Sequence, residues 1–179
     1  MESIAMLFTQ GGHDAYFGEP VTQLEHALQC AQLAEHSGAD NETVVAAFLH
    51  DIGHLLPPER AGNYMDGYGT VDHERLGADY LREIGFSEKV AQLIENHVNA
   101  KRYLVAKTPG YFDRLSEASL KTLTFQGGPM TPEEASIFET NPYFRGILQL
   151  RVWDEQAKIL DLPTPTLDYY LAKSKALLA

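Results

Sequence analysis

Residues 50 to 54 read His-Asp-Ile-Gly-His and follow an apolar run at residues 44 to 49. The alanine and leucine content of that run favours a buried helix over a strand. On a helix, His50 and Asp51 would point about 100° apart, which is a poor arrangement for pairing with each other. They could still bind one ion together, or Asp51 could bridge to a second ion. His54 would share the face of His50. Ionisable groups are costly to bury without partners. Taken alone, the stretch would also fit two hydrogen-bonded core histidines and one acid.

Further candidate ligands lie in or at the edge of other amphipathic segments: His26, His73, His97 and Asp154. Four imidazoles and two carboxylates are too many for one ion, but they are about right for two ions in a mixed nitrogen and oxygen shell. Imidazole suits Fe, Mn, Zn and Cu. Thiolate ligands are missing from the set, which removes the usual structural zinc site.

Helices are predicted to position these residues, and the pattern gives no strand, so the sequence predicts an all-α fold in one domain, 1–179. The capping box of Thr22 and Glu25, the early acids after Thr131-Pro132, and Ser87 mark three of the helix starts. A loop is expected at 13–20. The expected helices cover about 1–11, 22–37, from 40 or 41 through the central motif, 71–84, 87–105, 112–124, from 131, from 141, and 166–178.

Composition narrows the class of protein. The chain has 179 residues and a formal net charge of −11, which argues against non-specific binding of nucleic acid or an anionic membrane. An anionic ligand would need a few local cations. Cys30 is the single cysteine, so a reducing compartment is expected. The sequence offers no secretion signal and no apolar run of about 20 residues. We therefore expect a cytoplasmic protein; its oligomeric state is left open.

The ligand candidates stand along the chain in the order His26, His50-Asp51 and Asp154. This order resembles the H…HD…D signature of the HD-domain superfamily, and His73 and His97 match the two extra histidines of its dinuclear members. On this pattern alone, the resemblance implies a metal-dependent phosphohydrolase.

Longer stretches resemble one branch, the mixed-valence di-iron HD-domain oxygenases that act on phosphonates. The resemblance runs from about Tyr16 to Lys158 and is carried by residues 23–26 (QLEH), 37–42 (SGADNE), 77–82 (GADYLR), 97–105 (HVNAKRYLV), 126–130 (QGGPM) and 153–155 (WDE). It implies an HD-domain helical bundle with a dinuclear metal centre. It also implies an Fe(II)/Fe(III) pair, with O2 as co-substrate and a small organophosphonate as substrate.

The resemblance implies metal ligands position by position. One iron would be held by His26, His50, Asp51 and Asp154, and the other by His73, His97 and Asp51, which bridges. The implied catalytic residues are Tyr16, Glu19 and Lys101, and the implied substrate contacts are Glu19, His54, Lys101, Ser119 and Arg151.

Within that set, Tyr16 would cover the open position on iron and leave it when substrate enters, and Glu19 would receive the substrate ammonium. Lys101 lies one turn after His97, and Arg151 one turn before Asp154. Two cations that each lie one helical turn from a candidate ligand, in a protein of net charge −11, match an anionic head group independently of the resemblance.

The sequence therefore predicts a non-haem di-iron oxygenase that cleaves the C–P bond of a 1-hydroxyalkylphosphonate. The expected substrate is (R)-2-amino-1-hydroxyethylphosphonate, which would give glycine and phosphate. Three alternatives stay open: an HD-domain phosphohydrolase, an oxygenase for the trimethylammonio analogue or for hydroxymethylphosphonate, and a catalytically silent domain that uses metal for support.

Overall fold

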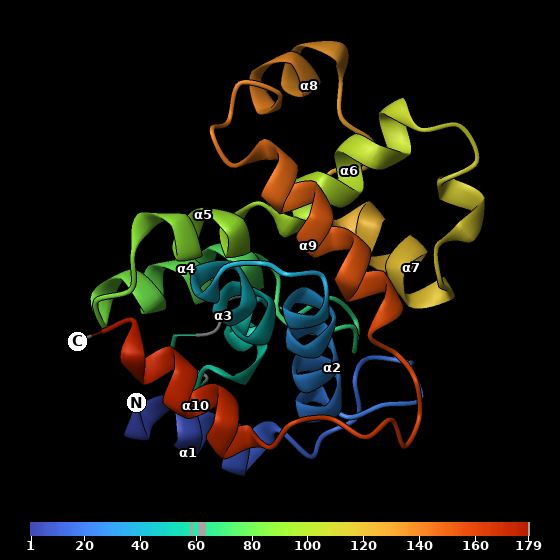
Figure 1. Ribbon diagram of the computed structural model, residues 1–179. Helices are drawn as coiled ribbons and strands as arrows, with labels where there is room; N and C mark the ends of the chain where they lie inside the picture. Colours follow the sequence, from blue (N-terminus) through green and yellow to red (C-terminus); the bar gives the residue numbers. More distant parts are fainter. Residues whose placement is uncertain (58, 61–63, 179) are drawn as a thin grey trace.

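The computed structural model describes residues 1–57, 59–60 and 64–178, and within them it is helical (Figure 1). Two isolated β-bridges, Ala15 with Thr22 and Tyr64 with Thr70, are the extended pairings of the described part. The helices are α1 (Glu2–Gly11), α2 (Gln23–His36), α3 (Asn41–Leu49), α4 (His73–Glu83), α5 (Glu88–Glu95), α6 (His97–Lys107), α7 (Glu117–Phe125), α8 (Pro132–Phe138), α9 (Phe144–Gln156) and α10 (Leu167–Ala176), with 3-10 turns at Ile52–Leu55 and Phe112–Arg114.

Helix α3 forms the centre of the core. Its residues from Thr43 to Leu49 are all buried, and it packs against α2, α5, α9 and α10 (Figure 1). An apolar helix surrounded in this way has no polar face to spare for solvent. Residues that directly follow α3 are therefore delivered into the interior of the bundle. The all-α expectation from the sequence is confirmed.

Helix starts agree with the sequence prediction where side chains cap them. Thr22 and Glu25 form the predicted capping box, and Thr131 and Glu134 form a second one. Asp40 caps α3 by accepting the Thr43 N–H at 3.0 Å. These caps satisfy backbone donors that the first turn of a helix leaves free, which is why the sequence signals were reliable there.

Three helix predictions were wrong. The helix that leads into the central motif ends at Leu49, and His54 lies in a separate 3-10 turn, so the argument that His50 and His54 share one helical face does not hold. The helix expected over 87–105 is broken at Asn96, where φ is −107°. There the Asn96 amide side chain donates to the Gln92 carbonyl and competes with regular backbone pairing. The helix expected over 112–124 begins only at Glu117.

Gly53 lets the motif turn lie against the start of α4. A Cβ added at Gly53 would lie 1.9 Å from the backbone oxygen of His73, so a side chain would force these two segments apart. The glycine in His-Asp-Ile-Gly-His thus brings the segments that carry His50, Asp51 and His73 together.

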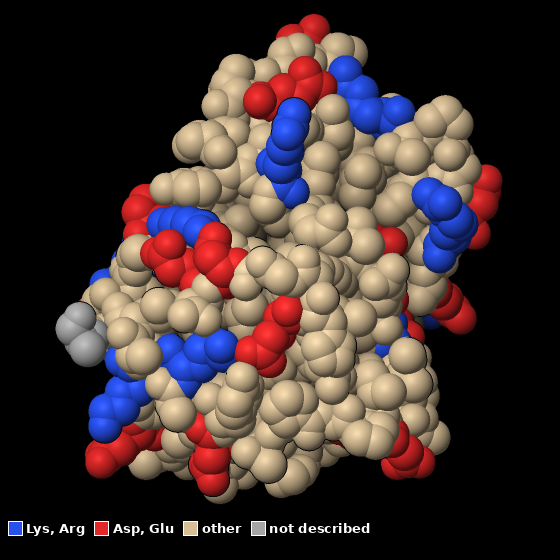
Figure 2. Space-filling view, viewed as in Figure 1, with Lys and Arg blue, Asp and Glu red and all other residues tan. Residues whose placement is uncertain are grey.

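The surface carries intermixed charge. Figure 2 shows basic side chains beside acidic ones on the displayed face, and Arg82, for example, pairs with Glu88 and Glu95. Among the described residues no helix is long and apolar enough to cross a membrane.

Candidate metal centre and active site

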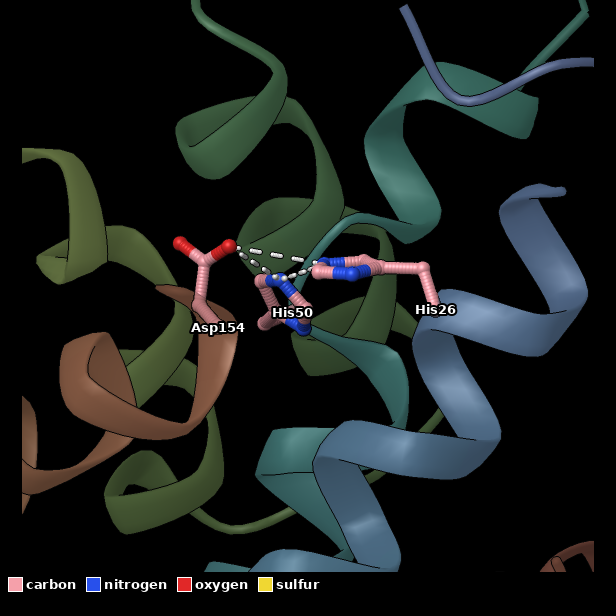
Figure 3. Close-up of side chains that lie close together, drawn as sticks. All are labelled: His26, His50 and Asp154. Carbon is pink, nitrogen blue, oxygen red and sulfur yellow. Dashed lines mark hydrogen bonds and ion pairs between the residues drawn. The ribbon is translucent and has the colours of Figure 1, made fainter. Parts of the chain in front are cut away.

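Three side chains from distant parts of the chain form the first cluster: His26 from α2, His50 directly after α3, and Asp154 from α9 (Figure 3). The two Nε2 atoms lie 3.2 Å apart. Asp154 Oδ1 lies 3.4 Å from His26 Nε2 and 3.9 Å from His50 Nε2. All three residues are buried.

A second cluster lies beside the first. The Nε2 atoms of His73 and His97 are 3.2 Å apart, and both imidazoles are buried at the first residues of α4 and α6. Asp51 joins the two clusters. Its Oδ2 lies 3.3 Å from His50 Nε2, and its Oδ1 lies 3.3 Å from His73 Nε2 and 3.5 Å from His97 Nε2. One carboxylate therefore offers one oxygen to each cluster.

Each of the four histidines is oriented by a backbone carbonyl, which lies in the last turn or at the end of a helix for His26, His50 and His97 and in an extended segment for His73. The Nδ1 atoms lie 2.7–3.2 Å from carbonyl oxygens, His26 with Ala157, His50 with Ala47, His73 with Thr70 and His97 with Ile94. Helix ends leave carbonyls without a backbone partner. An Nδ1–H that donates to a carbonyl leaves Nε2 as a lone pair, the usual arrangement of a metal-binding histidine.

The donor set fits cations. Four Nε2 lone pairs and two carboxylates converge. Two hydrogen-bond donors lie near them. The Tyr16 hydroxyl donates a hydrogen bond to Asp51 Oδ2 at 2.8 Å, and Arg151 donates to the outer oxygen of Asp154 at 2.6 Å. Burial would raise the pKa of Asp51, but His50 and His73 hold it well below its ordinary value. Burial would lower the pKa of His50 and of His73, but Asp51 raises both, so these two imidazoles also favour positive charge beside the carboxylate. Burial lowers the pKa of His97 to about 3. Converging acceptors of this kind repel one another unless positive charge lies between them.

A cavity opens next to both clusters, and its wall includes all the catalytic and substrate-binding candidates that the sequence predicted: Tyr16, Glu19, His54, Lys101, Ser119 and Arg151. Ser119 is buried at the start of α7. The structure thus brings these side chains together from the loop before α2, the motif turn, α6, α7 and α9.

Lys101 is the most deeply buried lysine of the cavity. It is 3% exposed, and its ammonium donates to Thr122 Oγ1 at 2.8 Å. Burial lowers its pKa from 10.5 to about 7, and the nearby Arg151 adds to this effect. No carboxylate pairs with it among the described ion pairs, so the cavity holds an ammonium that an anionic ligand would neutralise.

Arg151 is buried on α9 and is held from one side. It donates to Asp154 Oδ2 at 2.6 Å and to Glu155 Oε1 at 2.8 Å. The Tyr111 hydroxyl accepts from its Nε at 3.3 Å. Its Nη2 is buried without a hydrogen-bond partner among the described residues. An unused guanidinium N–H at the cavity wall is a ready donor to an anion.

His54 is held as a neutral donor. Its Nδ1 accepts the Thr70 backbone N–H at 3.0 Å, which places the remaining proton on Nε2. Burial holds the pKa of His54 well below its ordinary value. Its ring stacks on His73 at 3.8 Å between centroids. The cavity wall thus offers a fixed N–H beside the second cluster.

Comparison with known proteins agrees with this geometry. Residues 24–137 match the HD domain family. The chain is 44% identical over 170 residues to the 1-hydroxy-2-(trimethylamino)ethyl phosphonate dioxygenase (glycine-betaine-forming) of Leisingera caerulea, covering 95% of this chain and 85% of that protein. It is 42% identical over 171 residues to the hydroxymethylphosphonate dioxygenase of Gimesia maris, covering 94% and 85%. It is also 46% identical over 170 residues to the uncharacterised protein L432 of Acanthamoeba polyphaga mimivirus, covering 95% and 78%.

The chain belongs to the HD-domain oxygenases. In this chain the candidate ligands come from α2, α4, α6, α9 and the segment directly after α3. The predicted resemblance to this family is confirmed.

Sequence reasoning missed four residues that shape the site of this HD-domain oxygenase: Tyr111, Thr122, Glu155 and Lys158. Glu155 could have been found, because it stands four residues after Arg151 at ion-pair spacing. Tyr111 lies in the segment before α7 and Lys158 lies after α9, where no periodic pattern indicates which way a side chain points.

Proposed function

We propose that this HD-domain oxygenase uses O2 and a mixed-valence iron pair to cleave the C–P bond of a 1-hydroxyalkylphosphonate. The preferred substrate in this proposal is (R)-2-amino-1-hydroxyethylphosphonate, which gives glycine and phosphate. The reaction balances, because one O2 is consumed and its two oxygen atoms appear in the carboxylate and phosphate products. The observation that carries the proposal is the pair of buried cations, Lys101 and Arg151, in one cavity with the joined histidine–carboxylate clusters.

The relatives support the reaction class. Both characterised relatives are named as dioxygenases of phosphonates, and their names differ in the tail of the substrate: a trimethylamino group in one and none in the other. A shared head group with a variable tail is the pattern expected when the head-binding side chains are common and the tail pocket varies.

The proposed metal ligands are His26, His50, Asp51 and Asp154 for one iron, and His73, His97 and Asp51 for the other. Iron bound there would supply the redox chemistry and bind the substrate hydroxyl together with a phosphonate oxygen.

Binding of the phosphonate is the task of the cavity wall. Lys101 supplies an ammonium, and Arg151 supplies an Nη2 that has no hydrogen-bond partner in the described part of the chain. Each charge-assisted hydrogen bond contributes about 1.5–3 kcal/mol. His54 donates from Nε2, and the Ser119 hydroxyl adds a further hydrogen bond. These four groups orient the head so that the C1 hydrogen faces the metal centre.

Tyr16 acts as a cover over the centre. Its hydroxyl is hydrogen-bonded to Asp51, and its ring stacks on His26 at 3.9 Å between centroids. Substrate that binds next to Asp51 takes the place of this hydroxyl, so the Tyr16 turn must move outward. Burial and the negative charge of Asp51 raise the pKa of Tyr16, so the hydroxyl keeps its proton and donates it.

Glu19 provides the tail contact. It lies in the same cavity wall as Lys101 and Arg151. A primary ammonium donates up to three hydrogen bonds to a carboxylate, whereas a trimethylammonio group keeps the charge, donates none and favours aromatic faces. This difference is the reason to propose the primary amine.

The test is anaerobic loading with iron, followed by a phosphate-release assay with and without O2. Phosphate from (R)-2-amino-1-hydroxyethylphosphonate only in the presence of O2, with an equal amount of glycine, is the expected result. The trimethylammonio analogue and hydroxymethylphosphonate serve as matched substrates. Higher kcat/KM for either would reject the choice of tail, and phosphate release from a phosphate ester without O2 would replace the oxygenase chemistry with hydrolysis.

A further inference from the structure

Glu19 already has a cationic partner inside the protein. Lys158 Nζ lies 2.6 Å from Glu19 Oε1, and the two side chains are 16% and 11% exposed. Lys158 also donates to Ser116 Oγ at 3.4 Å, and its ammonium lies 6.0 Å from the centre of the Tyr16 ring. Burial alone would raise the pKa of Glu19, but the hydrogen bond from Lys158 holds it below its ordinary value.

Both partners of this pair are anchored to the metal centre. The Ala157 carbonyl, one residue before Lys158, lies 2.8 Å from His26 Nδ1. On the other side, Glu19 N–H donates to the Tyr16 carbonyl at 2.7 Å in a tight turn, and Tyr16 is hydrogen-bonded to Asp51. The ammonium and the carboxylate are therefore held near each other by the fold, with an effective concentration far above that of a free amine.

We propose that Lys158 is a specificity-determining residue that competes with the cationic tail of a substrate for Glu19. This inference rests on the proposed function and adds a residue to it. A substrate ammonium must displace the Lys158 ammonium from Glu19, so part of the attraction between tail and carboxylate is cancelled by the lost internal ion pair.

The three candidate tails meet this competitor differently. A primary ammonium replaces Lys158 donor for donor. A trimethylammonio group brings no N–H, so it cannot replace the hydrogen bond that it breaks. Hydroxymethylphosphonate has no tail and leaves the pair of Glu19 and Lys158 intact. Lys158 therefore sets how strongly the enzyme prefers a tail with an amine over no tail.

The experiment compares Lys158→Met with the wild type, both loaded with iron and kept anaerobic. Calorimetry measures the Kd of 2-amino-1-hydroxyethylphosphonate and of hydroxymethylphosphonate, and the ratio of the two values is the readout. Lys158→Met should shift that ratio about tenfold toward the amine, which equals about 1.4 kcal/mol. Lys158→Arg keeps the charge and the donors, so its ratio should shift by less than about threefold.

A matched control removes the same charge elsewhere. Lys173 pairs with Glu35 on the surface of α10, away from the cavity wall, so Lys173→Met should leave the ratio unchanged. Lys158→Gln provides a second variant if Lys158→Met folds poorly by circular dichroism, and it should shift the ratio in the same direction.

A double variant isolates the role of Glu19. In a Glu19→Ala background, Lys158→Met has no carboxylate to release, so the shift should vanish. A shift that persists in that background, or an unchanged ratio in Lys158→Met and Lys158→Gln, overturns the proposal. The wild type separates this outcome from failure of the proposed function: if neither phosphonate yields phosphate with O2, the function is wrong, and if phosphate appears but the ratio does not move, only the role of Lys158 is wrong.

Discussion

Replacing Lys101 with methionine should stabilise the protein while weakening its binding of a phosphonate. Lys101 is 3% exposed, and its pKa falls from 10.5 to about 7 because burial disfavours the charged form. At about 1.4 kcal/mol per pKa unit, this difference sets an upper limit of about 5 kcal/mol on the cost to the free energy of unfolding. The bond to Thr122 and the packing of the lysine stem offset part of that cost. We expect Lys101→Met to raise the free energy of unfolding by about 1–3 kcal/mol near pH 7.

The gain should depend on pH with a definite sign. Below pH 7 the lysine is protonated in both the folded and the unfolded protein, so the wild type bears the whole cost of burial. Between pH 7 and 10.5 only the unfolded chain keeps the proton, and the cost shrinks as pH rises. Above 10.5 both states are neutral and the cost is gone. The advantage of Lys101→Met is therefore largest at or below pH 7 and declines toward pH 10.5.

Urea unfolding followed by circular dichroism at pH 6.5 and pH 9.5 measures this effect, with the same metal content in every sample. Lys173→Met is the control. Because Lys173 is paired with Glu35, this variant should not raise the free energy of unfolding at pH 6.5. The reasoning is refuted if Lys101→Met is less stable than the wild type at pH 6.5, or if its advantage is the same at both pH values. In parallel, phosphonate affinity should fall about 10- to 100-fold.

The remaining predictions concern ligands, head group and fold. His73→Ala or His97→Ala should lower the iron content from two equivalents to about one and abolish O2-dependent phosphate release, while circular dichroism still reports an all-α protein; full activity with two equivalents would end the two-ion assignment. Arg151→Met should raise the Kd of hydroxymethylphosphonate about 10- to 100-fold by calorimetry, and an unchanged Kd would place the phosphonate elsewhere. Gly53→Ala should lower the midpoint of thermal unfolding by several degrees, because its Cβ would meet the His73 carbonyl, and an unchanged midpoint would contradict the close approach.

The sequence was most informative where one side chain decides the local structure. Caps such as Thr22 and Asp40 satisfy donors within three residues, so short-range chemistry alone predicts those helix starts. The residues of the two clusters were also predictable as a set, since four imidazoles and two acids in amphipathic segments are costly to bury without a shared partner, and the structure brings them together. Their grouping into two sets joined by Asp51 came from the family resemblance, because residue types and spacing alone do not divide them.

Other features depend on contacts that no local pattern encodes. The break at Asn96 and the end of α3 before His50 free the carbonyls that orient His97 and His50. Helical periodicity alone predicts that both helices continue, so it does not reveal these breaks. Lys158 reaches Glu19 across 139 positions of chain, because the backbone after α9 returns to the loop before α2. Long-range pairs of this kind follow from packing of the bundle and not from spacing.

The two clusters draw on residues at positions 26, 50, 51, 73, 97 and 154, on segments that span most of the chain. In the proposed assignment, the two ions would together tie α2, the segment after α3, α4, α6 and α9 into closed loops, a cross-linking role that disulfides cannot fill in a protein with a single cysteine. Global opening of the bundle would then require that the ions leave. The metal-loaded chain should therefore resist proteases far longer than the same chain after treatment with a chelator, and the rate at which iron escapes should set that lifetime.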